Sequence, residues 1–150
     1  MQPVSDLTAH TGYWLRMVSN AVSQDFARRL AAEGVTVAEW AFLRALYDAD
    51  AMAPSALADR MGMTRGAISK LADRLLEKGL IHRVDNPDDR RAHSLSLTAS
   101  GRTRVPVLAA LADRNDADYF GVLSADEQEA LGRILKRLAE QRGLTAMPLD

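Results

Sequence analysis

The sequence predicts a mainly α-helical fold that carries one small β-hairpin. Over most of the 150 residues, apolar side chains recur at every third or fourth position, as on one face of a helix. Two Thr/Ser-x-x-Glu motifs and several glycines mark where helices begin and end. Residues 80–97 differ, because a turn sequence separates a β-branched run from an alternating one, which is typical of two antiparallel strands.

The composition limits the class of protein. The chain has 19 Lys and Arg residues against 20 Asp and Glu, 47% hydrophobic residues and no cysteine. These values exclude a disordered or collagen-like chain, and the missing cysteines exclude disulfides and thiolate metal sites. The N-terminus lacks a secretory signal pattern, and the longest strongly apolar run, residues 105–112, is far too short for a membrane span. We therefore expect a cytoplasmic protein.

The N-terminal part predicts two helices joined at a glycine. The first runs from about Ser5 to Glu33, with apolar residues along one face and Gly34 as its stop. The second begins at Thr36, where Thr36 and Glu39 form a capping box: the hydroxyl accepts from a backbone N–H, and the carboxylate reaches back to the cap.

The middle of the chain predicts two short helices and a hairpin. Pro54 opens a helix over residues 54–61, Gly62 ends it, and Thr64 caps a second helix that runs to Lys78. Strands are expected over residues 80–84 and 94–97. The turn sequence Asn86-Pro-Asp-Asp89 lies between them, in a long loop that carries Arg90 and Arg91.

The C-terminal part predicts two further helices. Thr98 caps one that runs to about Leu123, with Pro106 expected to kink it or delay its start. A second capping box, Ser124 to Glu127, begins the last helix. The tail after Gly143 is expected to fray.

The central order is that of a winged helix-turn-helix: short helix, glycine turn, second helix, hairpin with a basic tip. The second helix, residues 64–78, carries four cations against two anions, whereas residues 113–129 carry six anions against one cation. The near-neutral total thus hides a basic surface suited to double-stranded DNA. The residues expected on the DNA-facing side of that helix are Thr64, Arg65, Gly66, Ser69, Lys70 and Arg74.

This region resembles the MarR family of winged-helix transcriptional regulators. The resemblance rests on residues 55–62, residues 64–81, Asn86-Pro-Asp-Asp-Arg-Arg-Ala92 and Leu95-Ser-Leu-Thr98. The Asp-Arg-Arg wing followed by Leu-x-Leu-Thr is its most specific part. Helices flank the winged helix on both sides, as in that family, so the resemblance covers nearly the whole chain.

The resemblance implies a homodimer that binds a pseudo-palindromic operator as a repressor. It also implies release by a small ligand, often an anionic aromatic, held between the dimerisation helices and the DNA-binding lobe. Residues 1–34 and 101–150 would form the dimerisation helices and residues 35–100 the DNA-binding region, all within one intertwined domain.

The resemblance also assigns residue roles in the wing and the ligand site. Asp89 would brace the wing by pairing with an arginine, and Arg90 or Arg91 would enter the minor groove. The candidates for ligand binding are His10, Tyr13 and Trp14 on the first helix.

Other function classes have little support in the sequence. The three histidines share no metal-ligand spacing, and no nucleophile elbow or phosphate-binding glycine loop occurs, so we expect no enzyme, no metal and no cofactor. Two alternatives stay open. One is a winged-helix module that binds a protein, and the other is an architectural DNA binder that responds to no ligand.

Overall fold

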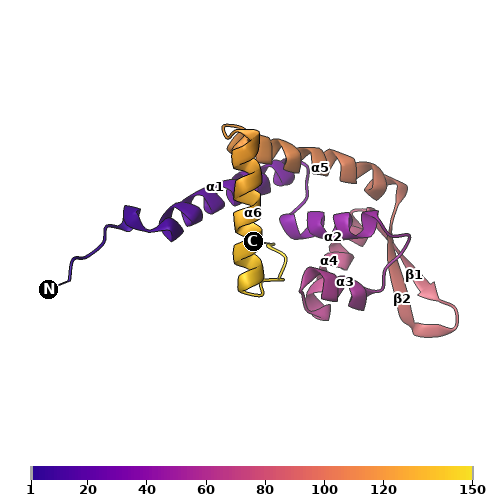
Figure 1. The fold of residues 1–150 in the computed structure, drawn as a ribbon. Coiled ribbons are helices and arrows are strands. Elements are labelled where there is room, and N and C mark those ends of the chain that lie inside the picture. The colour runs from indigo at the N-terminus through magenta and orange to yellow at the C-terminus, as the bar shows by residue number, and fades with distance from the viewer. Residues whose placement is uncertain (1, 150) are drawn as a thin grey trace.

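The computed structural model describes residues 2–149, except that the side chains of residues 89–91 lie outside the described part. It confirms a mainly helical fold with one two-stranded antiparallel hairpin (Figure 1). The elements are η1 (Leu7–Ala9), α1 (Thr11–Ala32), α2 (Val37–Tyr47), α3 (Pro54–Met61), α4 (Arg65–Glu77), β1 (Ile81–Asn86), β2 (Asp89–Leu97), α5 (Ala99–Phe120) and α6 (Ala125–Gln141).

The helix caps predicted at Thr36, Thr64, Thr98 and Ser124 are confirmed by their hydrogen bonds. The start predicted near Ser5 is wrong, because α1 begins at Thr11 after the separate turn η1. The Thr36 hydroxyl accepts from Glu39 N at 3.1 Å, and Thr36 N donates to the Glu39 carboxylate at 3.1 Å. The same reciprocal pair begins α6 at Ser124, and Thr64 caps α4. Gly62 has φ 65°, the left-handed conformation that ends α3 and lets α4 cross it.

The hairpin is tighter at its tip than expected. Residues 87–88 alone join the strands, and Asn86 Oδ1 accepts from Asp88 N at 3.0 Å, as in an Asx turn. The register pairs Asp85 with His93 but Asn86 with Asp89, which leaves residues 90–92 as an irregularity in β2. The prediction of a long loop is therefore wrong, because the extra residues lie within the strand.

The hydrophobic core lies in the winged-helix lobe, which is formed by α2, α3, α4 and the hairpin. The C-terminal end of α1 and the first half of α5 also contribute buried residues to this core. The fully buried residues Phe42, Leu57 and Ile68 come from three different helices of the lobe. At Gly101 a Cβ atom would stand 2.0 Å from Leu80 O, so only glycine lets α5 begin against the hairpin.

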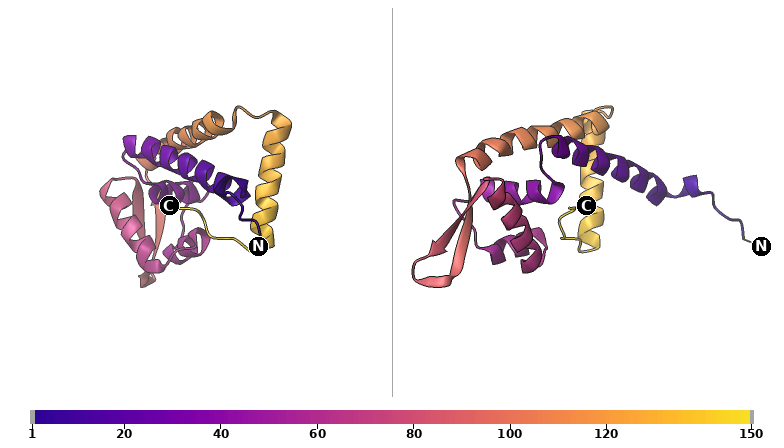
Figure 2. Two further views of the ribbon diagram at one scale, coloured as in Figure 1. Left: turned by 90° about the vertical axis from the view of Figure 1, so that its left-hand side faces the viewer. Right: turned by 180° about the vertical axis from the view of Figure 1, so that it is seen from behind.

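An arm of helices extends from this lobe. Figures 1 and 2 show α1 and α5 side by side, with the first part of α1 reaching outward and α6 standing apart from the lobe. Helix α5 begins at Ala99 and continues through Pro106, so the late start considered for it is wrong. None of the described helices is long and apolar enough to cross a membrane.

The C-terminal tail departs from expectation. It returns from the end of α6 to the lobe (Figure 2), and Met147 and Leu149 pack against the core. Ala146 lies beside Gly62, its Cα 3.6 Å from where a Cβ would stand. The expected fraying is wrong, because burying apolar side chains fixes the segment.

Candidate nucleic-acid interface

Helix α4 divides into a buried face and a polar face. Ile68, Leu71 and Leu75 recur at helical spacing and are buried against the lobe. The structure places on the other, exposed face the residues predicted to meet DNA: Arg65, Gly66, Ser69, Lys70 and Arg74. Thr64 is exposed at the N-terminus, where its hydroxyl accepts from Ala67 N at 3.1 Å.

The cations on this face are available to a ligand. Arg65, Lys70 and Arg74 form no ion pair with any side chain that the structure describes. Asp73, the anion between them in sequence, lies 3.7 Å from Arg83 on β1. Because that pair offsets the acidic charge, the exposed face of α4 is positive, as an anionic phosphate backbone requires.

Lys78, the last of the four cations of residues 64–78, is bonded away from this positive face. Its Nζ donates to the Glu39 carboxylate at 2.7 Å and to Gly34 O at 2.8 Å. The Glu39 side chain is 1% exposed. Burial raises the pKa of the Glu39 carboxyl, but hydrogen bonds from Lys78 and Thr36 outweigh burial and hold that pKa below its ordinary value.

Two cations hold the C-terminal end of α1. Arg104 on α5 donates to Glu33 O and, at 3.2 Å, to the Glu33 carboxylate, while Lys78 at the end of α4 donates to Gly34 O. Cations suit this position because the last carbonyls of a helix are unpaired and partially negative. The turn after α1 is thereby bonded to both α5 and α4.

The wing residues predicted to contact DNA lie on β2. Asp89, Arg90 and Arg91 belong to β2 near the hairpin tip, but their side chains lie outside the described part of the chain. Their assigned roles stay predictions. Arg83 on β1 is an exposed wing cation that the sequence analysis did not single out.

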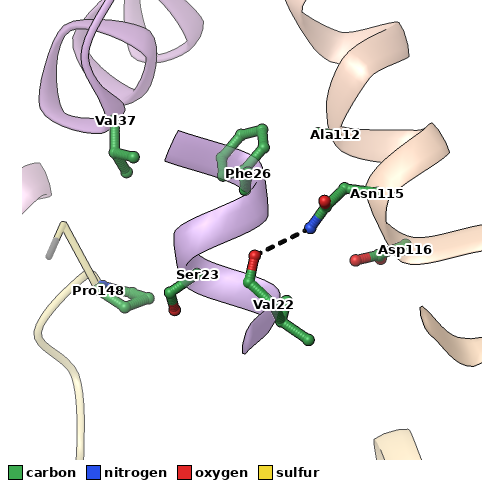
Figure 3. Close-up of a pocket in the computed structure, with 8 residues that line it drawn as sticks. All are labelled: Val22, Ser23, Phe26, Val37, Ala112, Asn115, Asp116 and Pro148. Carbon is green, nitrogen blue, oxygen red and sulfur yellow. Dashed lines mark hydrogen bonds between the residues drawn. The ribbon is translucent and has the colours of Figure 1, made fainter. Parts of the chain in front are cut away.

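The predicted ligand residues gather at the outer end of α1. His10 is the residue before the helix, Tyr13 and Trp14 meet edge to face with ring centroids 5.3 Å apart, and Trp14 Nε1 donates to Thr8 O at 2.9 Å. A cavity of about 220 Å³ lies elsewhere, between α1 and α5 (Figure 3). Val22, which lines it, is about 12 Å along the helix from Trp14.

Comparison with known proteins places this arrangement in a family. A family model described as the MarR family matches residues 33–92. The chain is 34% identical over 136 residues to a Thauera aromatica protein named as a transcriptional regulatory protein for the hcr operon, covering 90% of this chain and 82% of that one. It is 28% identical over 140 residues to the HTH-type transcriptional repressor MdtR of Bacillus subtilis, covering 93% and 90%.

Solved structures share the fold. A mutant MarR from E. coli complexed with operator DNA superposes with a TM-score of 0.73 at 26% identity, covering 85% of this chain and 91% of that one. The PcaV regulator of Streptomyces coelicolor, in complex with its natural ligand, superposes with a TM-score of 0.74 at 27% identity, covering 93% and 98%. With the family model and the Thauera relative, these likenesses show that the chain belongs to the MarR family of DNA-binding transcriptional regulators, which are not enzymes.

Proposed function

We propose that this protein is a homodimeric, sequence-specific repressor whose α4 enters the major groove of an operator. The observation that carries the proposal is the exposed α4 face, with Arg65, Lys70 and Arg74 unpaired among the described side chains. Residues at the N-terminus of a recognition helix reach base edges, so Thr64, Arg65 and Ser69 read bases. Lys70 and Arg74 lie further along the helix and bind phosphates.

The hairpin supplies a second contact with DNA. Strand β1 of the wing contacts α4, where Arg83 lies 3.7 Å from Asp73, and the hairpin projects beyond it. An arginine at its tip suits the concentrated negative potential of a narrow minor groove. We assign that insertion to Arg90 or Arg91, with Asp89 bracing the wing. Gly66 on α4 has open space where a side chain would stand, which allows close approach of the helix to the groove.

Dimerisation is supported by apolar side chains that the single chain leaves uncovered. On α1, Trp14 is 50% exposed, and on α6 Ile134 is 48% and Leu138 55% exposed. Exposed apolar faces on two helices are typical of an interface. A second copy covering them places the two recognition helices on half-sites about 34–36 Å apart, one turn of DNA.

Ligand control follows from how the arm is joined to the lobe. A small molecule lodged between α1 and the winged-helix lobe shifts the end of α1. That end is joined to α4 by the hydrogen bond from Lys78 to Gly34 O. Such a molecule weakens operator binding only if it has higher affinity for the arrangement that does not fit DNA. The names of two similar proteins, the repressor MdtR and the ligand-bound PcaV, agree with this mode of action. The site of action is the cytoplasm, where an operator is found.

The phosphate contacts can be tested before the operator is known. We expect the affinity for a mixed-sequence duplex to fall with salt, and the slope of log K against log salt to decrease by about 1 in Lys70→Ala and in Arg74→Ala. The matched control is Arg114→Ala, an exposed arginine on α5 that should leave the slope unchanged. Equal slopes in all four proteins would remove α4 from the interface. Absence of duplex binding at low salt would favour the protein-binding module.

A further inference from the structure

The C-terminal tail, residues 145–149, is mostly apolar. Ala146, Met147, Pro148 and Leu149 follow one another in the sequence. A proline favours extended backbone at the residue before it and lowers the entropy that the segment loses when it docks. Met147 and Leu149 are half-buried, and among the described residues after α5 only these two pack against the core. The tail is therefore what ties the end of α6 to the winged-helix lobe.

The tail lies in the cleft between α1 and the lobe. On the α1 side, residues 146–149 share a cavity with Ser23 and its neighbours on that helix. On the lobe side, Met147 and Pro148 line a cavity of about 370 Å³ together with Trp40 of α2 and Arg60 of α3. Figure 3 shows Pro148 beside Ser23. The tail thus fills part of the cleft and reaches both of its walls.

The tail also reaches the turn that precedes the recognition helix. Four described glycines have left-handed backbone, and Gly62, between α3 and α4, is the only one of them that another segment faces. Ala146 Cα lies 3.6 Å from where a Cβ of Gly62 would stand. The turn is closed by a hydrogen bond from Met63 N to Ala58 O at 2.9 Å. Because α4 begins at Arg65, a segment against this turn acts on the start of α4.

Side-chain packing holds the tail without help from the backbone. No described backbone hydrogen bond involves residues 145–149. A segment of this kind opens locally at a much lower free energy than the core does. From two half-buried apolar side chains, we expect the docked form to exceed the released form on the order of tenfold. Such a ratio makes the contact reversible.

We infer that residues 145–149 are a releasable strap that positions the start of α4 relative to the helical arm. The docked strap joins the end of α6 to α1 and to the α3–α4 turn, so it limits movement of the lobe relative to α6. Recognition helices held at one separation bind one spacing of half-sites best, because preorganisation lowers the entropy lost on binding. Docking of the strap is independent of the proposed function, whereas its effect on operator spacing rests on that function.

Amide hydrogen exchange measured by NMR tests the docking. In a chain that ends at Leu144, and in Met147→Asp, the Gly62 amide should exchange about tenfold faster than in the full chain, because the strap no longer covers the turn. The glycine turn after α4 is an internal control, since Gly79 faces no other segment and should keep its rate. Leu144→Asp adds the same charge just before the strap, at a side chain that is 67% exposed, and should change neither turn.

The spacing of operator half-sites tests the positioning. The probes are a duplex selected by the full chain and the same duplex with one base pair added between its half-sites. The chain ending at Leu144 should lose at least about threefold of the preference for the first duplex, while its salt slope on a mixed-sequence duplex stays the same. Ser23→Cys with Pro148→Cys, joined by a bismaleimide, should keep the full preference, and no native cysteine competes for the reagent.

Two sets of results would overturn the inference. One is equal exchange at Gly62 in the full and shortened chains, or equal acceleration at Gly62 and Gly79, which would reduce the tail to a contribution to overall stability. The other is a spacing preference that shortening the chain leaves unchanged. If the full chain selects no inverted repeat while exchange at Gly62 responds as expected, the proposed function fails, and with it the effect on spacing, whereas docking of the strap is supported.

Discussion

The winged-helix lobe buries its large apolar side chains, whereas the helical arm, formed by α1, α5 and α6, exposes several of its own. In the lobe, large side chains such as Phe42 and Leu46 are fully buried. In the arm, α1 exposes Trp14 and Met17, and α6 exposes Leu138. Because exposed apolar area costs about 25 cal/mol per Å², the lobe needs no partner to bury its core, whereas we propose that a second surface covers the arm.

The two regions meet at the end of α1, where they are joined by polar contacts. Lys78 donates to the carbonyl of Gly34, and Arg104 donates to the carbonyl of Glu33. Lys78 also pairs with the buried carboxylate of Glu39. We propose that a movement of the arm relative to the lobe disturbs these bonds. The following predictions test that division, from the largest expected effect to the smallest.

The arm should depend on its apolar face for association. Replacing both Ile134→Asp and Leu138→Asp removes apolar burial worth roughly 4 kcal/mol per dimer, so the dimer Kd should rise on the order of a thousandfold. Sedimentation velocity measures this, and circular dichroism should show that the monomer keeps its helices. Lys136→Asp on the same helix is the control and should leave the Kd nearly unchanged. An unchanged sedimentation coefficient in the double variant would show that α6 covers no partner.

The lobe should depend on its core for folding. Phe42→Ala should lower the free energy of unfolding by about 3–5 kcal/mol, because it leaves a large cavity in a region that cannot collapse. Urea denaturation measures the loss. Val122 is 87% exposed, so Val122→Ala should change the same quantity by less than about 0.5 kcal/mol. Similar losses in both variants would mean that the lobe is no better packed than the arm.

The junction between lobe and arm, formed by Lys78, Glu39 and Gly34 at the end of α1, should have an intermediate effect on the free energy of unfolding. Lys78→Met leaves the Glu39 carboxylate buried with its strongest partner removed, and should lower the free energy of unfolding by about 2–3 kcal/mol. The loss is smaller than for a fully buried pair because the Lys78 side chain is 39% exposed. Duplex binding should weaken as well, since α4 loses its bond to Gly34 O. Unaltered duplex affinity would show that Lys78 supports stability without positioning α4.

The same junction should respond to acid. The pKa of Glu39 is lowered in the folded chain from an ordinary value of 4.5, so its carboxylate stabilises the fold above that pH, and the stabilisation is lost as pH falls through the folded pKa. The difference in unfolding free energy between the unmodified chain and Glu39→Gln should thus be full at neutral pH and shrink in acid. A difference that does not vary with pH would contradict the charged pair.

The smallest effect is expected at the tail. Deleting the residues after Gly143 removes the packing of Met147 and Leu149, both partly buried, and should lower the free energy of unfolding by about 1–2 kcal/mol. Leu144→Ala is the control, because that side chain is 67% exposed. Equal stability of the truncated and full chains would mean that the tail does not pack in solution.

Local chemistry accounts for what the sequence predicted well. The boxes at Thr36 and Ser124 satisfy backbone groups within one turn, and Gly62 supplies a conformation that its own residue type favours. These signals need no knowledge of the rest of the chain. The exposed face of α4 could be predicted for the same reason, because the positions of Ile68 and Leu71 determine which side is buried.

Long-range contacts account for what the sequence could not predict. Lys78 bonds a residue 39 positions away, and Arg104 one that is 71 positions away, so neither partner could be identified from spacing. Met147 packs only because the chain returns to the lobe after α6. The cavity at Asn115 arises where two helices meet, and a single asparagine in a helical pattern does not indicate it.

The central claim is that two copies of α4 read an inverted repeat, and duplex selection from a randomised library by the purified protein tests it most directly. The account predicts enrichment of an inverted repeat with half-sites about one helical turn apart, and relaxed specificity at the base that Arg65→Ala no longer reads. Salt-sensitive binding with no enriched sequence would contradict specific recognition and favour an architectural DNA binder. Absence of duplex binding even at low salt would contradict the claim altogether and leave the protein-binding module.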